Sequence, residues 1–75
     1  MPKLHPVPSG DIVRTLERLG FTRVRQRGSY LVLKRITTGG SNTCVVPMHG
    51  EVKVGTLRSI LHQADVTVDE FLRNL

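Results

Sequence analysis

The chain has 75 residues, a net charge of +5, a pI of about 10.4 and 39% hydrophobic residues. A domain of this size buries only about 60% of the surface that its unfolded chain exposes, which excludes a large cofactor-binding fold. The single cysteine excludes an internal disulfide, and no apolar run approaches the roughly 20 residues that a membrane span needs. We therefore expect one small cytoplasmic domain whose positive charge attracts a polyanionic partner. Nucleic acid is the commonest such partner, and an acidic protein is the next.

The N-terminal part of the chain predicts a flexible lead-in followed by a helix. Residues 1–8 contain three of the four prolines, so we expect an extended segment without a helix or strand, and a single domain over residues 9–75. A helix is predicted over about residues 10–19, with Ser9 as its N-cap and Gly20 as its left-handed end. Its apolar face consists of Ile12, Val13, Leu16 and Leu19.

An alternating pattern between residues 21 and 36 predicts two β-strands. Gly28 and Ser29 separate these strands, and glycine in the first central position suits a type II′ hairpin turn. A two-residue turn at this point predicts a pairing register in which residue 27 lies opposite 30, 25 opposite 32 and 23 opposite 34.

This register decides which side chains share a face of the sheet, because successive residues of a strand point to opposite sides. The core side is expected to carry Val24, Leu31 and Leu33. The other side is expected to be basic with one aromatic ring, and it carries Arg23, Arg25, Arg27, Tyr30, Val32 and Lys34.

The second half of the chain predicts a third strand and two helices. Residues 37–42 are expected to form a flexible loop, residues 43–47 a strand that ends at Pro47, and residues 48–55 a further loop. The next helix has an apolar stripe of Leu57, Ile60, Leu61 and Ala64.

The C-terminal residues predict a short third helix. Thr67 and Glu70 have the spacing of a capping box, and Val66 and Phe71 have that of a hydrophobic staple, so the helix is expected to begin at Val68. Its apolar side consists of Val68, Phe71, Leu72 and Leu75. The order α-β-β-β-α predicts an α+β fold in which helices cover one face of a three-stranded antiparallel sheet and the basic face is open to solvent.

The sequence contains no recognisable metal-binding or cofactor-binding motif. His5, His49 and His62 are not spaced with Cys44 as a ligand set, and no acidic cluster is present for a hard cation. There is also no phosphate-binding loop or dinucleotide fingerprint. We expect no metal and no cofactor.

Four short motifs follow one another in an order that resembles the HicA-type (YcfA-like) toxins, over roughly residues 9–71. They are Leu19-Gly20-Phe21, Arg25-Gln26-Arg27-Gly28-Ser29, Val46-Pro47-Met48-His49 and Gly55-Thr56-Leu57-Arg58-Ser59-Ile60-Leu61. The resemblance implies a double-stranded-RNA-binding-domain-like fold and an mRNA interferase of a toxin–antitoxin pair. It also implies cleavage of mRNA without metal or cofactor, and neutralisation by a HicB-type antitoxin.

One position departs from the family pattern. Members usually carry the catalytic histidine directly after the Gly-Ser or Gly-Gly of the hairpin, and this sequence has Tyr30 there. Attack by a 2′-hydroxyl needs a base with a pKa near neutral, which histidine supplies and tyrosine, with a reference pKa of about 10, supplies poorly. A tyrosine can still donate a proton, bind a phosphate or stack on a base.

Three interpretations of this departure stay open. The chain is a natural variant that uses His49, a non-catalytic descendant that binds RNA or the antitoxin, or a variant inactivated deliberately so that a toxic protein can be produced.

The candidate catalytic residues are Tyr30 and His49. His49 is a candidate general base after the third strand, and its alternative role is to cap a turn or bind a backbone carbonyl. Lys53 either anchors a phosphate or is a solvated charge.

The candidate RNA-binding residues are Arg23, Arg25, Arg27, Gly28, Ser29, Lys34 and Lys53. For the cations of the sheet, the alternative is a polar face that keeps the domain soluble and discourages edge pairing. The same face is expected to serve RNA and an acidic segment of the antitoxin.

Overall fold

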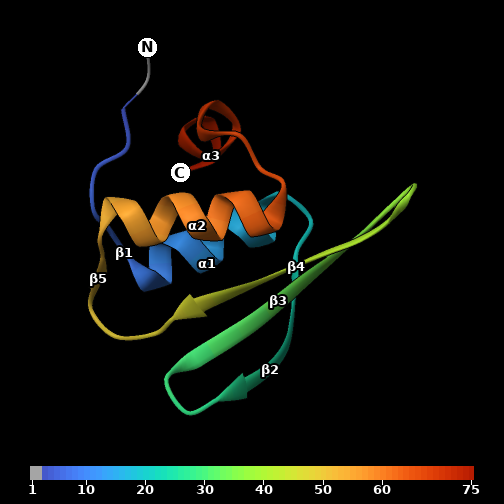
Figure 1. Ribbon diagram of the computed structural model, residues 1–75, viewed down its shortest axis with the longest axis horizontal. Helices are drawn as coiled ribbons and strands as arrows, with labels where there is room; N and C mark the ends of the chain where they lie inside the picture. Colours follow the sequence, from blue (N-terminus) through green and yellow to red (C-terminus); the bar gives the residue numbers. More distant parts are fainter. Residues whose placement is uncertain (1–2) are drawn as a thin grey trace.

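The computed structural model describes residues 3–75 (Figure 1). Its elements are β1 (Val7–Pro8), α1 (Ser9–Arg18), β2 (Thr22–Arg27), β3 (Tyr30–Thr37), β4 (Gly40–Pro47), β5 (Glu51–Val52), α2 (Val54–Ala64) and α3 (Val68–Asn74). Strands β2, β3 and β4 form an antiparallel sheet in that order, and β1 pairs with β5. Helices α1 and α2 lie on one side of the larger sheet, and α3 packs beyond them (Figure 1). The predicted α+β fold, with its double-stranded-RNA-binding-domain-like order, is confirmed.

The N-terminal segment belongs to the folded domain, and the prediction that it contains no strand is wrong. Leu4 and Val7 are buried in the core. Val7 lies opposite Val52, so β1 and β5 form a short ladder between segments that are distant in sequence. The pairing tolerates a proline in β1 because the ladder is short and has a free edge. Residues 1–2 of the predicted lead-in lie outside the described residues.

The segment after β4 is also more ordered than predicted. The expected loop over residues 48–55 contains β5, and α2 begins within it at Val54. The carbonyl of Gly50 accepts a hydrogen bond of 3.0 Å from the N–H of Ser9. This contact joins the loop to the start of α1, a pairing that no local pattern indicates.

Helix α1 begins and ends one residue earlier than predicted, at Ser9 and Arg18. The prediction that Ser9 is the N-cap is wrong, because Pro8, which has no side chain able to cap, occupies that position. The predicted left-handed glycine after the helix is confirmed. Gly20 has a φ of 99°, and the N–H of Phe21 donates to the carbonyl of Leu16 at 3.0 Å. This is the Schellman arrangement, in which glycine avoids the strain of the left-handed conformation.

The β2–β3 hairpin has the predicted turn and two of the three predicted pairs. Arg27 lies opposite Tyr30 and Arg25 lies opposite Val32. Gly28 has a φ of 60° and the next residue does not have a positive φ, as a type II′ turn requires. A β-bulge between residues 23 and 25 then places 23 opposite 33 and 22 opposite 34, so the predicted pair 23–34 is wrong.

The bulge changes the environment of two side chains. Arg23 shares the helix-covered face with Leu33, and its Nε donates to a carboxylate oxygen of Glu17 at 3.3 Å. Val24, which was predicted to lie in the core, is 52% exposed. Both predictions fail because strict alternation ends where one strand carries an extra residue. Leu31 and Leu33 are buried, as predicted.

The β3–β4 hairpin is longer than predicted. β3 continues to Thr37 and β4 begins at Gly40, so the predicted loop over residues 37–42 is reduced to a two-residue turn. The tip of this hairpin extends beyond the helices (Figure 1). The predicted third strand over residues 43–47 is confirmed as the second half of β4.

The core lies between the helices and the sheet, and the predicted stripes of α1 and α2 supply most of its helical side. Ile12, Leu16 and Leu57 are fully buried. In α3 the capping box is confirmed, because the Thr67 hydroxyl accepts from the N–H of Glu70 at 3.1 Å and the Glu70 carboxylate accepts from the N–H of Thr67 at 3.2 Å. Val66 and Phe71 are buried as the predicted staple requires, whereas Leu75 is 43% exposed.

Arg35, which no sequence pattern singled out, joins the sheet to both long helices. It lies on the helix-covered face of β3, where Nη1 donates to the carbonyl of Leu19 at 3.1 Å and Nη2 to the carbonyl of Ala64 at 3.3 Å. Its guanidinium carbon lies 4.7 Å from the centre of the Phe21 ring. Both carbonyls end a helix, and a cation there also interacts favourably with the helix dipole.

Cys44 is fully buried on the helix-covered face of β4. Burial raises the pKa of its thiol from the ordinary 9.0 to about 11, although the Arg35 charge opposes this shift. Between these values the unfolded chain has lost its thiol proton and the folded chain has kept it, so stability falls as pH rises. We expect the free energy of unfolding to fall by about 1.5 kcal/mol between pH 9 and pH 10.5 through this group.

Urea unfolding at a series of pH values measures this dependence. Cys44→Ala is expected to be less stable at every pH but to lack this part of the slope. An equal slope in both proteins would contradict the assignment to Cys44.

Candidate functional site

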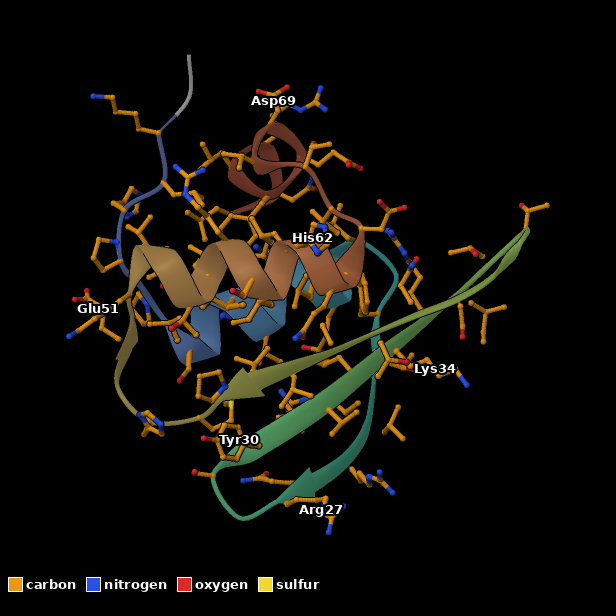
Figure 2. The ribbon with its side chains drawn as sticks, viewed as in Figure 1. Arg27, Tyr30, Lys34, Glu51, His62 and Asp69 are labelled. Carbon is orange, nitrogen blue, oxygen red and sulfur yellow. The ribbon has the colours of Figure 1, made fainter. Side chains whose placement is uncertain are left out.

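The face of the sheet turned away from the helices carries most of the predicted cations. Paired residues share a face, so the register places eleven side chains on it, which we call the open face: Thr22, Arg25, Arg27, Tyr30, Val32, Lys34, Ile36, Ser41, Thr43, Val45 and Pro47. Arg27 and Tyr30 lie at the same end of the β2–β3 hairpin, and Lys34 lies further along β3 (Figure 2). The predicted placement of Arg25, Arg27, Tyr30 and Lys34 is confirmed, and that of Arg23 is wrong.

The open face is positively charged without local compensation. None of the 6 Asp and Glu residues lies between residues 18 and 50, so the larger sheet contains no carboxylate. The ion pairs among residues 3–75 join Arg14 to Asp11, Arg23 to Glu17 and Arg73 to Asp69. Arg25, Arg27 and Lys34 are exposed and take part in none of them. Such a group of cations raises the local potential and attracts phosphates.

The hairpin turn lies beside the loop that follows β4. Tyr30 pairs with Pro47 at the end of the β3–β4 ladder. The N–H of Met48 donates to the carbonyl of Ser29 at 2.5 Å, which holds the start of the loop against the turn. Two segments that are separated by almost twenty residues, one with Tyr30 and the other with His49, are therefore neighbours in space.

His49 and Lys53 line the same open depression of about 180 Å³. Its lining consists of Pro47, His49, Glu51, Val52, Lys53 and Thr56. An exposed imidazole can transfer a proton and an ammonium can stabilise negative charge, so the depression has groups suited to a phosphodiester. The structure thus brings together two of the predicted site residues, His49 and Lys53. They lie beside Pro47, which pairs with Tyr30. Glu51 was missed by the sequence reasoning, since its position depends on the β1–β5 ladder.

The other two histidines do not line this depression. His62 lies on α2 and is exposed (Figure 2), and His5 is exposed with its Nδ1 3.0 Å from the carbonyl oxygen of Pro6. Among residues 3–75 no three His, Cys, Asp or Glu side chains are grouped closely enough to hold a metal ion. In the same part of the chain, every helix is too short or too polar to cross a membrane.

A known protein family matches most of this chain. The family model described as "HicA toxin of bacterial toxin-antitoxin" matches residues 9–66, and no curated protein matches the chain. The matched segment begins with α1 and ends just after α2, so it contains the whole open face, the hairpin turn and the depression. Because the match covers most of the sequence, the chain belongs to the HicA toxin family, whose members pair with antitoxins.

Proposed function

We propose that this protein is the toxin of a type II toxin–antitoxin pair and acts as a metal-independent mRNA endoribonuclease. The proposal rests on one observation, which is that two features of this HicA-family domain lie next to each other. A carboxylate-free basic face leads to a depression that contains His49 and Lys53, and Tyr30 lies at the boundary between them. The face supplies binding and the depression supplies groups for acid–base chemistry.

In this proposal RNA lies along the open face. Arg25, Arg27 and Lys34 contact phosphates, and the Gly28-Ser29 turn lets the backbone approach closely. Arg23 is not among these contacts, since it pairs with Glu17 on the other face.

The reaction is attack of a 2′-oxygen on the adjacent phosphorus. His49 accepts the proton of the 2′-hydroxyl, the new P–O bond forms, and the bond to the 5′-oxygen breaks. Tyr30 donates a proton to that leaving oxygen, while Lys53 and Arg27 stabilise the charge on the phosphorane. The products are a 2′,3′-cyclic phosphate and a 5′-hydroxyl.

The partner in this proposal is a HicB-type antitoxin. An acidic segment of such a protein fits the same basic face and blocks RNA by occupying it, because both ligands are polyanionic.

Cleavage of labelled single-stranded RNA in EDTA tests the proposed activity. We expect products with a cyclic phosphate end, at a rate that falls at least tenfold in His49→Ala. His62→Ala is the matched control, because His62 is exposed on α2 away from the depression, and its rate should be unchanged. Tight binding with intact RNA would instead support a non-catalytic module that binds RNA or the antitoxin.

The salt dependence of binding tests the basic face separately. Replacing Arg25 and Arg27 by Ala is expected to weaken binding of a non-cleavable RNA and to reduce the slope of log K against log salt by about 0.7 for each lost phosphate contact. The control is the double variant Arg14→Ala/Arg73→Ala, which removes the same number of positive charges from two ion-paired positions. The slope of log K against log salt should stay close to that of the unchanged protein in this control. Equal changes of this slope in the two double variants would show that RNA binds to a surface other than the open face.

A further inference from the structure

Residues 4–9, which we call the strap, pack against the segment between the candidate site residues His49 and Lys53. The last three residues of the strap run antiparallel to this segment, and β1 lies beside β5 (Figure 1). The contacts join Val7 to Val52, Pro8 to Glu51 and Ser9 to Gly50. The strap therefore contacts every residue that separates His49 from Lys53.

The strap is anchored in the core at two points. Leu4 is 9% exposed and Val7 is 1% exposed, and both belong to the same buried cluster as Val52. Because the hydrophobic effect favours burial of these side chains, it opposes detachment of the strap. The family match begins at residue 9, so both anchors lie outside the matched segment.

The segment between β4 and α2 has a left-handed residue near its centre. Gly50 has a φ of 65°, which glycine adopts without strain, and the same freedom gives an unrestrained loop many other conformations. Before this residue, the N–H of Met48 is held by the carbonyl of Ser29, and after it α2 begins at Val54. The N–H of Ser9 donates to the carbonyl of Gly50 at 3.0 Å. This hydrogen bond restrains the residue at which the loop turns most easily.

The separation of His49 and Lys53 depends on the backbone that joins them. Both side chains line the depression, together with Glu51 and Val52 of β5. Proton transfer requires the reacting groups to lie within hydrogen-bond reach, and a displacement of about 1 Å lowers a rate by about 10²-fold. A segment that fixes the backbone between two such side chains therefore controls the rate without contacting the substrate.

We propose that the strap is a positioning element of the candidate site. By pairing with residues 50–52 it holds His49 and Lys53 in the depression, and it takes no part in the chemistry. This inference rests on the proposed function, because it takes the depression as the place of cleavage. It adds that a segment lying almost entirely outside the family match determines the geometry of the site.

Replacing Ser9 by proline tests the inference at a single hydrogen bond. Ser9 is the first residue of α1, where proline is favoured, and Pro8 has a ψ of 140°, which a following proline allows. The substitution removes the N–H that binds Gly50 and leaves α1 intact. We expect the amide hydrogen of Val52 to exchange about tenfold faster. We also expect kcat for RNA cleavage in EDTA to fall about tenfold, with KM within about twofold because the open face is unchanged.

Matched controls separate positioning from a general loss of stability. Ser9→Ala keeps the N–H and should change neither amide exchange nor kcat. Val7→Ala loosens an anchor of the strap and should have the same two effects as Ser9→Pro. Its control is Val66→Ala, which truncates a buried valine between α2 and α3 and should leave both quantities unchanged. Circular dichroism checks that each variant is folded.

Two results would overturn the inference. One is exchange at Val52 that Ser9→Pro and Val7→Ala leave unchanged, and the other is faster exchange with an undiminished kcat. If the unchanged protein does not cleave RNA, the proposed function is wrong, and the ¹⁵N order parameter of His49 decides the inference by itself. We expect this order parameter to fall from about 0.85 to below about 0.6 in Ser9→Pro, and an unchanged value would show that the strap does not hold the site.

Discussion

Replacing Tyr30 by histidine is expected to raise the rate of RNA cleavage by about 10²–10⁴-fold, the usual contribution of a positioned acid or base. Tyr30 follows the type II′ turn, is half exposed and lies beside the loop with His49. A histidine at this position brings a group with a reference pKa of about 6.5 to the edge of the basic face. The smaller ring fits a surface position without creating a cavity. Initial rates in EDTA between pH 5 and pH 9 measure the effect.

The controls for this substitution separate the imidazole from the loss of the phenol. Tyr30→Phe should show no gain, because phenylalanine transfers no proton. Expression of Tyr30→His in bacteria is expected to stop growth, and co-expression of the cognate antitoxin should restore it. If Tyr30→His neither cleaves RNA nor arrests growth, the assignment of this position to the catalytic centre is wrong.

Replacing Arg35 by methionine is expected to lower the free energy of unfolding by about 3 kcal/mol. The change removes two charged hydrogen bonds, to the carbonyls of Leu19 and Ala64, and the stacking on Phe21. The buried Nε of Arg35 has no hydrogen-bond partner among residues 3–75, which reduces the net contribution of the side chain below the sum of its contacts. A chain of this size has a total stability of about 4–11 kcal/mol, so the loss is a large fraction of it.

Urea unfolding with two further variants tests this interpretation. Arg35→Lys keeps the charge but not the planar fork, so we expect it to recover only part of the stability. Lys34→Met removes the neighbouring cation from the open face and should change stability by less than about 0.5 kcal/mol. A loss below 1 kcal/mol in Arg35→Met would show that the contacts with the two helix ends are replaced by water at little cost.

The family resemblance stated from the sequence is confirmed by the family model, and the structure confirms most of the predicted residues of the open face. The Gly28-Ser29 turn, the two strand pairs next to it and the positions of Arg25, Arg27, Tyr30 and Lys34 were predicted from spacing. Tyr30 and His49 were both named as candidate catalytic residues, but no local pattern in the sequence places their two segments side by side. The pairing of β3 with β4 brings these segments together.

Local signals in the sequence determine the three helices, the three longer strands, the Gly28-Ser29 turn, the glycine that ends α1 and the capping box of α3, because each of these depends on residues close together in the chain. Only the tertiary structure decides the bulge that moves Arg23 to Glu17, the β1–β5 ladder and the contact of Arg35 with two helix ends. The same is true of the neighbouring pairs Tyr30–Pro47 and Val32–Val45, because half of their residues come from β4. These features depend on pairing between distant segments, and one inserted residue in a strand reverses a face without leaving any local pattern.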